Sequence, residues 1–65
     1  MKIKINDRSI ELFHGATLKH ALLKTDENLY RLVRDGKASI KDQEGNITDI
    51  NGAAGSGFSY YVVNN

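Results

Sequence analysis

Apolar and polar residues alternate in two short runs at the start of the chain. Residues 2–6 place Ile3 and Ile5 on one side of an extended backbone, and residues 9–13 alternate in the same way. Asn6-Asp7-Arg8 lies between the runs, and Asn and Asp tolerate left-handed backbone geometry. The pattern therefore predicts a β-hairpin with one half-buried face.

The spacing of apolar residues becomes helical after Gly15. We expect a short helix over residues 18–24, and Thr17 is its candidate N-cap residue. A second helix is predicted over 26–35. Acidic side chains in its first turn interact favourably with the helix dipole, and Gly36 is a residue that typically ends a helix. The alternative is one helical region with a break between these ranges.

Alternation returns in the second half of the chain. Residues 37–50 are predicted to form another hairpin that turns at Gly45, with Ala38 and Ile40 pointing inward. Residues 51–57 are rich in glycine and predict a tight loop. The most apolar run of the sequence, residues 58–63, is typical of a strand in the middle of a sheet.

This order of elements predicts an α+β fold in one domain over residues 1–65. A β-grasp arrangement is expected, in which a four- to five-stranded mixed sheet packs on one or two short helices. The right-handed crossover rule places the helices on one face, and the first and last strands become parallel neighbours.

Composition restricts the function. The 65 residues include no cysteine, and nine Lys and Arg balance eight Asp and Glu for a net charge of +1. Disulfides and thiolate metal sites are thus excluded, and strong non-specific binding to nucleic acid or anionic membranes is disfavoured. The alternating N-terminus is unlike a signal peptide, so we expect a soluble, cytoplasmic protein.

Two segments resemble a known family. Residues 2–6 (KIKIN) followed by 15–18 (GATL) look like the opening of the small ubiquitin-like sulfur carriers, namely the thiamine-biosynthesis carrier and the molybdopterin-synthase small subunit. Residues 54–62 look like their final turn and strand, where Gly57 matches the turn glycine. Ser56 and Phe58, however, stand where the family usually has acids.

The resemblance implies a ubiquitin-like β-grasp fold and a partner such as an adenylating activating enzyme or a synthase. Family members end in Gly-Gly, whose carboxylate becomes a thiocarboxylate. In this sequence Asn64 and Asn65 follow the final strand, so no reactive residue is transferred from the family.

No pattern predicts catalytic, cofactor-binding or metal-binding residues, and we expect a protein that is not an enzyme. His14 and His20 form an incomplete set of metal ligands. Residues 51–57 lead into a strand and lack the lysine of a phosphate-binding loop, so a tight turn is the better interpretation.

The face of the sheet opposite the helices is the candidate site. If Tyr60 and Val62 point to the helices, Tyr61 and Val63 point away from them. Such a small apolar group, rimmed by charge, is typical of either a recognition surface or an ordinary protein surface. The predicted partner-binding residues are Lys2, Lys4, Lys41, Tyr61 and Val63.

Three functions remain open. The first is a non-catalytic, ubiquitin-like protein-binding module that uses the face around Tyr61. The second is a sulfur carrier or modifier, which is implied only by the resemblance. The third is binding of single-stranded nucleic acid, with Tyr61 and Phe13 stacking on bases, although the near-neutral charge weighs against it.

Overall fold

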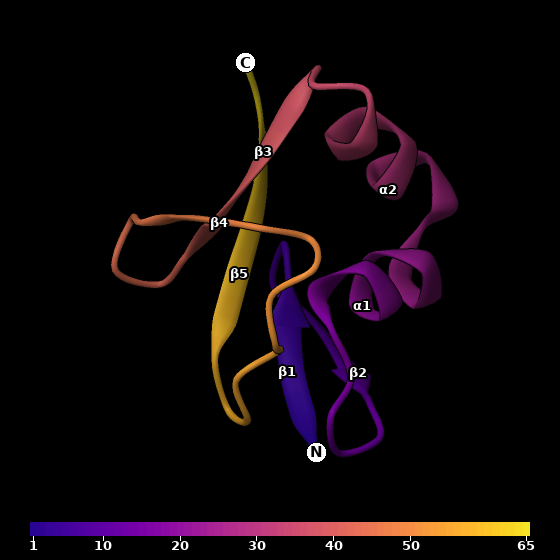
Figure 1. Ribbon diagram of the computed structural model, residues 1–65. Helices are drawn as coiled ribbons and strands as arrows, with labels where there is room; N and C mark the ends of the chain where they lie inside the picture. Colours follow the sequence, from indigo (N-terminus) through magenta and orange to yellow (C-terminus); the bar gives the residue numbers. More distant parts are fainter.

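Five strands and two helices make up the chain in the computed structural model, which describes residues 1–65 (Figure 1). The elements are β1 (Lys2–Ile5), β2 (Arg8–Glu11), α1 (Leu18–Thr25), α2 (Glu27–Arg34), β3 (Ala38–Asp42), β4 (Ile47–Thr48) and β5 (Ser59–Asn64). This order confirms the predicted α+β class.

The strands form one mixed sheet in the order β2-β1-β5-β3-β4. β5 lies in the middle, as its apolar sequence predicts, and it pairs in parallel with β1 and antiparallel with β3. Ile5 lies opposite Tyr60, and Lys41 lies opposite Tyr61. The last strand therefore joins an N-terminal and a C-terminal hairpin into a single sheet.

Both helices lie on the same side of the sheet (Figure 1). The core is formed where α1 meets the inward residues of the strands, and α2 covers it less completely. The fully buried side chains with the largest volumes are Ile3, Ile5, Leu18, Leu22 and Ile40. The inward orientation predicted for the strand residues among them is confirmed.

The helical region consists of two helices rather than one. Thr17 is the extended N-cap residue of α1, and its backbone N–H donates to Nδ1 of His20 at 3.0 Å. Asp26 is extended between the helices, where Oδ1 of its carboxylate accepts from the backbone N–H of Asn28 at 2.9 Å. Neither helix has the length and apolar character needed to cross a membrane.

Besides the early end of β2 at Glu11, two further strand boundaries differ clearly from the sequence-based prediction. The second strand of the hairpin expected over 37–50 ends at Thr48 instead of residue 50, because the carboxylate of Asp49 accepts from the N–H of Asn51 and bends the chain. The final strand begins after Phe58, whose N–H closes the preceding turn by donating to the carbonyl of Gly55. Local hydrogen bonds in the loops thus set these boundaries, although the carbonyl of Phe58 still accepts from the N–H of Lys4 on β1.

Candidate functional site

The sheet face away from the helices, here called the open face, gathers all five predicted site residues. Side chains of a strand alternate between the two faces, and directly paired residues of neighbouring strands share a face. Since Ile3, Ile5, Ile40 and Tyr60 are buried under the helices, the residues between them point outward. The open face includes Lys2, Lys4, Ser39, Lys41, Ser59, Tyr61 and Val63.

Three apolar side chains lie exposed on the open face and form what we call the apolar strip. Tyr61 and Val63 of β5 are each 37% exposed, and Ile47 of β4 is 69% exposed. Lys41 connects them, because it is paired with Tyr61 on one side and with Ile47 on the other. The strip therefore extends from the central strand to the edge of the sheet.

Ile47 is the member of the apolar strip that sequence reasoning did not find. The predicted hairpin over 37–50 left its register undefined, so the direction of Ile47 was not assigned. The available signal was the turn itself. A turn centred on Glu44, with Gly45 at positive φ, pairs Lys41 with Ile47 and puts both side chains on one face.

A hollow of about 280 Å³ lies beside the apolar strip. We call it the basic hollow, because Lys2 and Lys4 of β1 line it. Lys4 is paired with Ser9 on β2 and with Ser59 on β5, so two hydroxyl groups flank its base. The lining residues are Lys2, Ile3, Lys4, Ser9, Gly57, Phe58 and Ser59.

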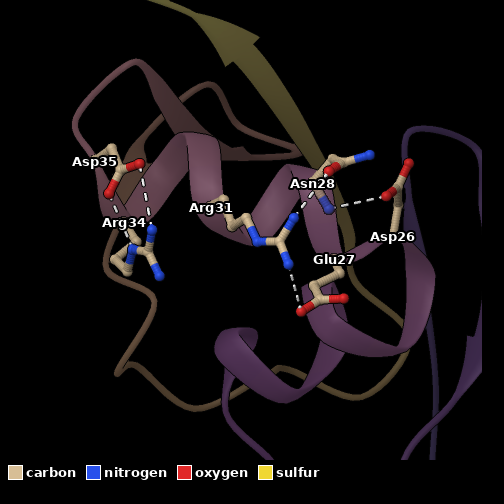
Figure 2. Close-up of polar contacts among 6 residues, drawn as sticks. All are labelled: Asp26, Glu27, Asn28, Arg31, Arg34 and Asp35. Atoms are coloured by element: carbon tan, nitrogen blue, oxygen red, sulfur yellow. Dashed lines mark hydrogen bonds and ion pairs between the residues drawn. The ribbon is translucent and has the colours of Figure 1, made fainter.

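The lysines of the open face have no carboxylate partner, whereas the arginines of α2 do. Arg31 pairs with Glu27 at 2.9 Å, and Arg34 pairs with Asp35 at 2.9 Å (Figure 2). The hydrogen bond between Arg34 and Asp35 raises the pKa of Arg34 and lowers the pKa of the Asp35 carboxyl group. The two arginines of α2 are thus neutralised locally by neighbouring carboxylates.

Lys2, Lys4 and Lys41 take part in none of the ion pairs of the structure. The one acid of the sheet strands on this face, Glu11, is paired in register with Lys2, and its carboxylate lies 3.3 Å from the amino group of Met1. Lys4 and Lys41 therefore add positive charge to the open face with no carboxylate within ion-pair distance, as is also the case for Lys19 and Lys24 of α1.

The position expected for Phe13 is wrong. The nucleic-acid hypothesis placed it on the open face with Tyr61, but the alternation stops when β2 ends at Glu11. The Phe13 ring instead packs edge-on against His20 of α1, with the ring centroids 5.1 Å apart. Phe13 and Leu23 border a separate hollow of about 370 Å³ beside that helix. Tyr61 is consequently the only aromatic residue of the apolar strip, while Phe58 at the border of the basic hollow stacks on Tyr60.

The other sequence candidates have local structural roles. Nδ1 of His20 is engaged at the start of α1, and no group of three or more His, Asp or Glu side chains is arranged to hold a metal ion. In the glycine-rich loop, the amides of Gly52, Gly55 and Gly57 all donate hydrogen bonds within the chain. The loop is therefore a tight turn, as predicted, and these amides are occupied.

No protein-family model matches this chain, and no curated protein or solved structure shows significant similarity to it. The resemblance to the sulfur carriers consequently stays a prediction from short sequence motifs. The geometry of the open face is the basis on which function can be argued.

Proposed function

We propose that this chain is a ubiquitin-like β-grasp module that binds another protein through its open face and has no catalytic activity of its own. The observation that carries the proposal is the apolar strip, formed by Tyr61, Val63 and Ile47. These side chains are exposed together on a regular sheet, at positions that the register holds fixed.

The β-grasp assignment is supported by the topology. An N-terminal hairpin leads through the helices to a second hairpin, and the last strand returns to the centre beside the first. The parallel pair β1–β5 has antiparallel neighbours on both sides, with the helices on one face. The opposite face is left uncovered and available to a partner.

The apolar strip has the properties of an interaction surface. Aromatic and aliphatic side chains in the centre with a polar rim are the usual composition of a protein interface. Tyr61 belongs to the central strand, which is hydrogen-bonded on both sides, so binding would require little ordering of the backbone. A small, preorganised patch of this kind suits a modest interface with another folded protein.

Affinity capture followed by quantitative mass spectrometry tests this proposal. The wild-type chain is compared with a Tyr61→Asp/Val63→Asp variant and with Tyr61→Thr/Val63→Thr, which keeps residues of high strand propensity. We expect a defined partner to be captured by the wild-type chain and lost from both variants. Circular dichroism and thermal melting establish that each variant is folded.

The matched control is Phe13→Asp/Leu23→Asp, which alters the exposed apolar residues beside α1 instead. This variant should retain the partner. A set of captured proteins that is the same for the wild-type chain and both open-face variants would contradict the proposal. Loss of the partner only from the Phe13→Asp/Leu23→Asp variant would move the interface to the other surface.

A further inference from the structure

We propose that the partner presents an acidic segment to the open face, with carboxylates on both sides of an apolar side chain. This inference rests on the proposed function and specifies the chemistry of the partner. It is carried by the unpaired lysines that lie on both sides of the apolar strip's central strand.

The positions of the lysines define the pattern that a partner must match. Lys4 on β1 and Lys41 on β3 flank β5 from opposite sides, with Tyr61 between the two strands. Lys4 lies opposite Ser59, two residues before Tyr61, which Lys41 faces. Because strands are about 4.8 Å apart and rise about 3.3 Å per residue, the two lysine Cα atoms lie roughly 12 Å apart on a diagonal across the sheet. An extended acidic segment that crosses the strands can reach both ammonium groups and place an apolar residue on Tyr61.

The basic hollow adds a second point of contact. Lys2 and Lys4 approach it from the same strand, and the hydroxyl groups of Ser9 and Ser59 border it. Ammonium and hydroxyl groups are donors that a carboxylate accepts, and a charge-assisted hydrogen bond is stronger than a neutral one. The hollow of about 280 Å³ is large enough for one acidic side chain.

Protection of the sheet edges does not explain these lysines. Charged residues, lysine above all, often prevent edge strands from pairing with other molecules. Here β1 and β3 are interior strands, because β2 and β4 form the two edges. The lysines therefore act on the face of the sheet, where positive charge attracts acidic partners and repels basic ones.

The apolar strip favours a protein over a nucleic acid as the source of the negative charge. Proteins that bind single strands stack successive bases on several aromatic side chains. Tyr61 is the only aromatic residue of the apolar strip, and Val63 and Ile47 are aliphatic. Phe58 borders the basic hollow, but its ring stacks on Tyr60. Aliphatic contacts combined with lysines match an acidic peptide that also carries apolar residues.

Selection from a phage library of random dodecapeptides tests the inference with the intact chain as bait. Recovered peptides are synthesised with a fluorescent label, and binding is measured by anisotropy. We expect them to be enriched in Asp and Glu around an apolar residue. Their affinity should fall when salt rises from about 50 to about 300 mM, because the screening length shortens.

Charge reversal then locates the interaction. Lys4→Glu/Lys41→Glu should weaken binding by about tenfold or more, as expected for the loss of close charge pairs at an interface. Lys19→Glu/Lys24→Glu on α1 makes the same change in net charge away from the open face and should have less than about a twofold effect, since exposed distant charges are screened. Lys4→Thr/Lys41→Thr, which keeps strand propensity, should show an intermediate loss.

The outcomes separate this inference from the proposed function. Peptides that lose binding in Tyr61→Thr/Val63→Thr but not in Lys4→Glu/Lys41→Glu would overturn the acidic partner and leave the binding face intact. Peptides that are sensitive to neither variant would overturn both proposals. Recovery of no peptide, or binding of a labelled oligothymidylate in place of peptides, would also overturn the acidic-protein assignment.

Discussion

Tyr60 and Tyr61 are adjacent in sequence but have opposite roles in the structure. Tyr60 is 4% exposed, and its hydroxyl oxygen accepts from the backbone N–H of Gly55 at 2.9 Å. Its ring stacks on Phe58, with centroids 6.1 Å apart. Tyr61 faces solvent on the open face. Alternation along β5 therefore assigns one tyrosine to the fold and leaves its neighbour available for binding.

Replacing Tyr60 by Phe is expected to destabilise the protein by about 1–2 kcal/mol, because the amide of Gly55 would lose its acceptor in a partly buried position. Urea unfolding followed by circular dichroism measures the change. Tyr61→Phe is the matched control, and it should change the free energy of unfolding by less than about 0.5 kcal/mol, as for most surface substitutions. Equal effects of the two substitutions would argue against the hydrogen bond.

The inward direction of Tyr60 could be predicted from the sequence, but its hydrogen bond could not. Period-two alternation fixes which face of a strand a residue occupies. The partner atom belongs to the loop over residues 51–57, which folds back over the sheet and is crowded there. A Cβ at Gly55 would lie 3.0 Å from Cγ of Phe58. Such contacts depend on tertiary packing that short-range patterns do not encode.

At the scale of elements, the break between α1 and α2 depends on Asp26. Its extended backbone ends one helix, and its carboxylate caps the next by accepting from Asn28. α2 has no fully buried residue, and Leu29, Tyr30 and Val33 only partly cover the core. Since tertiary packing contributes less to α2 than to α1, its ends contribute a larger share of its stability.

Asp26→Ala is expected to destabilise the protein by about 1 kcal/mol, the usual effect of removing an N-cap side chain. Amide hydrogen exchange should accelerate more in α2 than in β5, because a short surface helix can open locally. Asp26→Asn supplies the control, since asparagine caps helices about as well as aspartate. An equal acceleration of exchange in α2 and β5 would show that the cap does not act locally.

The types of the elements were predictable where the apolar pattern was regular. The predicted boundaries were wrong where polar side chains form hydrogen bonds with the nearby backbone. The alternation of β1 and β3 and the helical spacing of α1 agree with the structure. Asp49 ends β4 early by such a bond. Phe13 was misplaced because the alternation of β2 was extended past its last paired residue.

For the whole molecule, β5 is the connection on which cooperative folding depends. The hairpin β1–β2 and the hairpin β3–β4 meet only through it within the sheet. The location of the open-face residues followed from this topology, because a central last strand places Tyr61 and Val63 among the lysines of its neighbours. The binding role that we propose for them depends on a partner, and a partner's identity is not encoded in the periodicity of one chain.

Ile40→Ala tests this cooperativity. Ile40 on β3 is fully buried and paired with Val62 of β5. The substitution should cost about 2–5 kcal/mol, which is a large share of the roughly 3–10 kcal/mol expected for a chain of this length. Because β5 joins both hairpins, the amides of β1 should lose protection from hydrogen exchange together with those of β3.

Ile47→Ala on the neighbouring strand is the matched control, since Ile47 is 69% exposed and its removal leaves no cavity. We expect it to change the free energy of unfolding by less than about 1 kcal/mol, the range of strand propensities. If Ile40→Ala instead exposed only β3 and β4 while β1 and β2 stayed protected, the hairpins would be independent units. The open face would then not be one rigid surface, and the lysines of β1 could not act in register with Lys41.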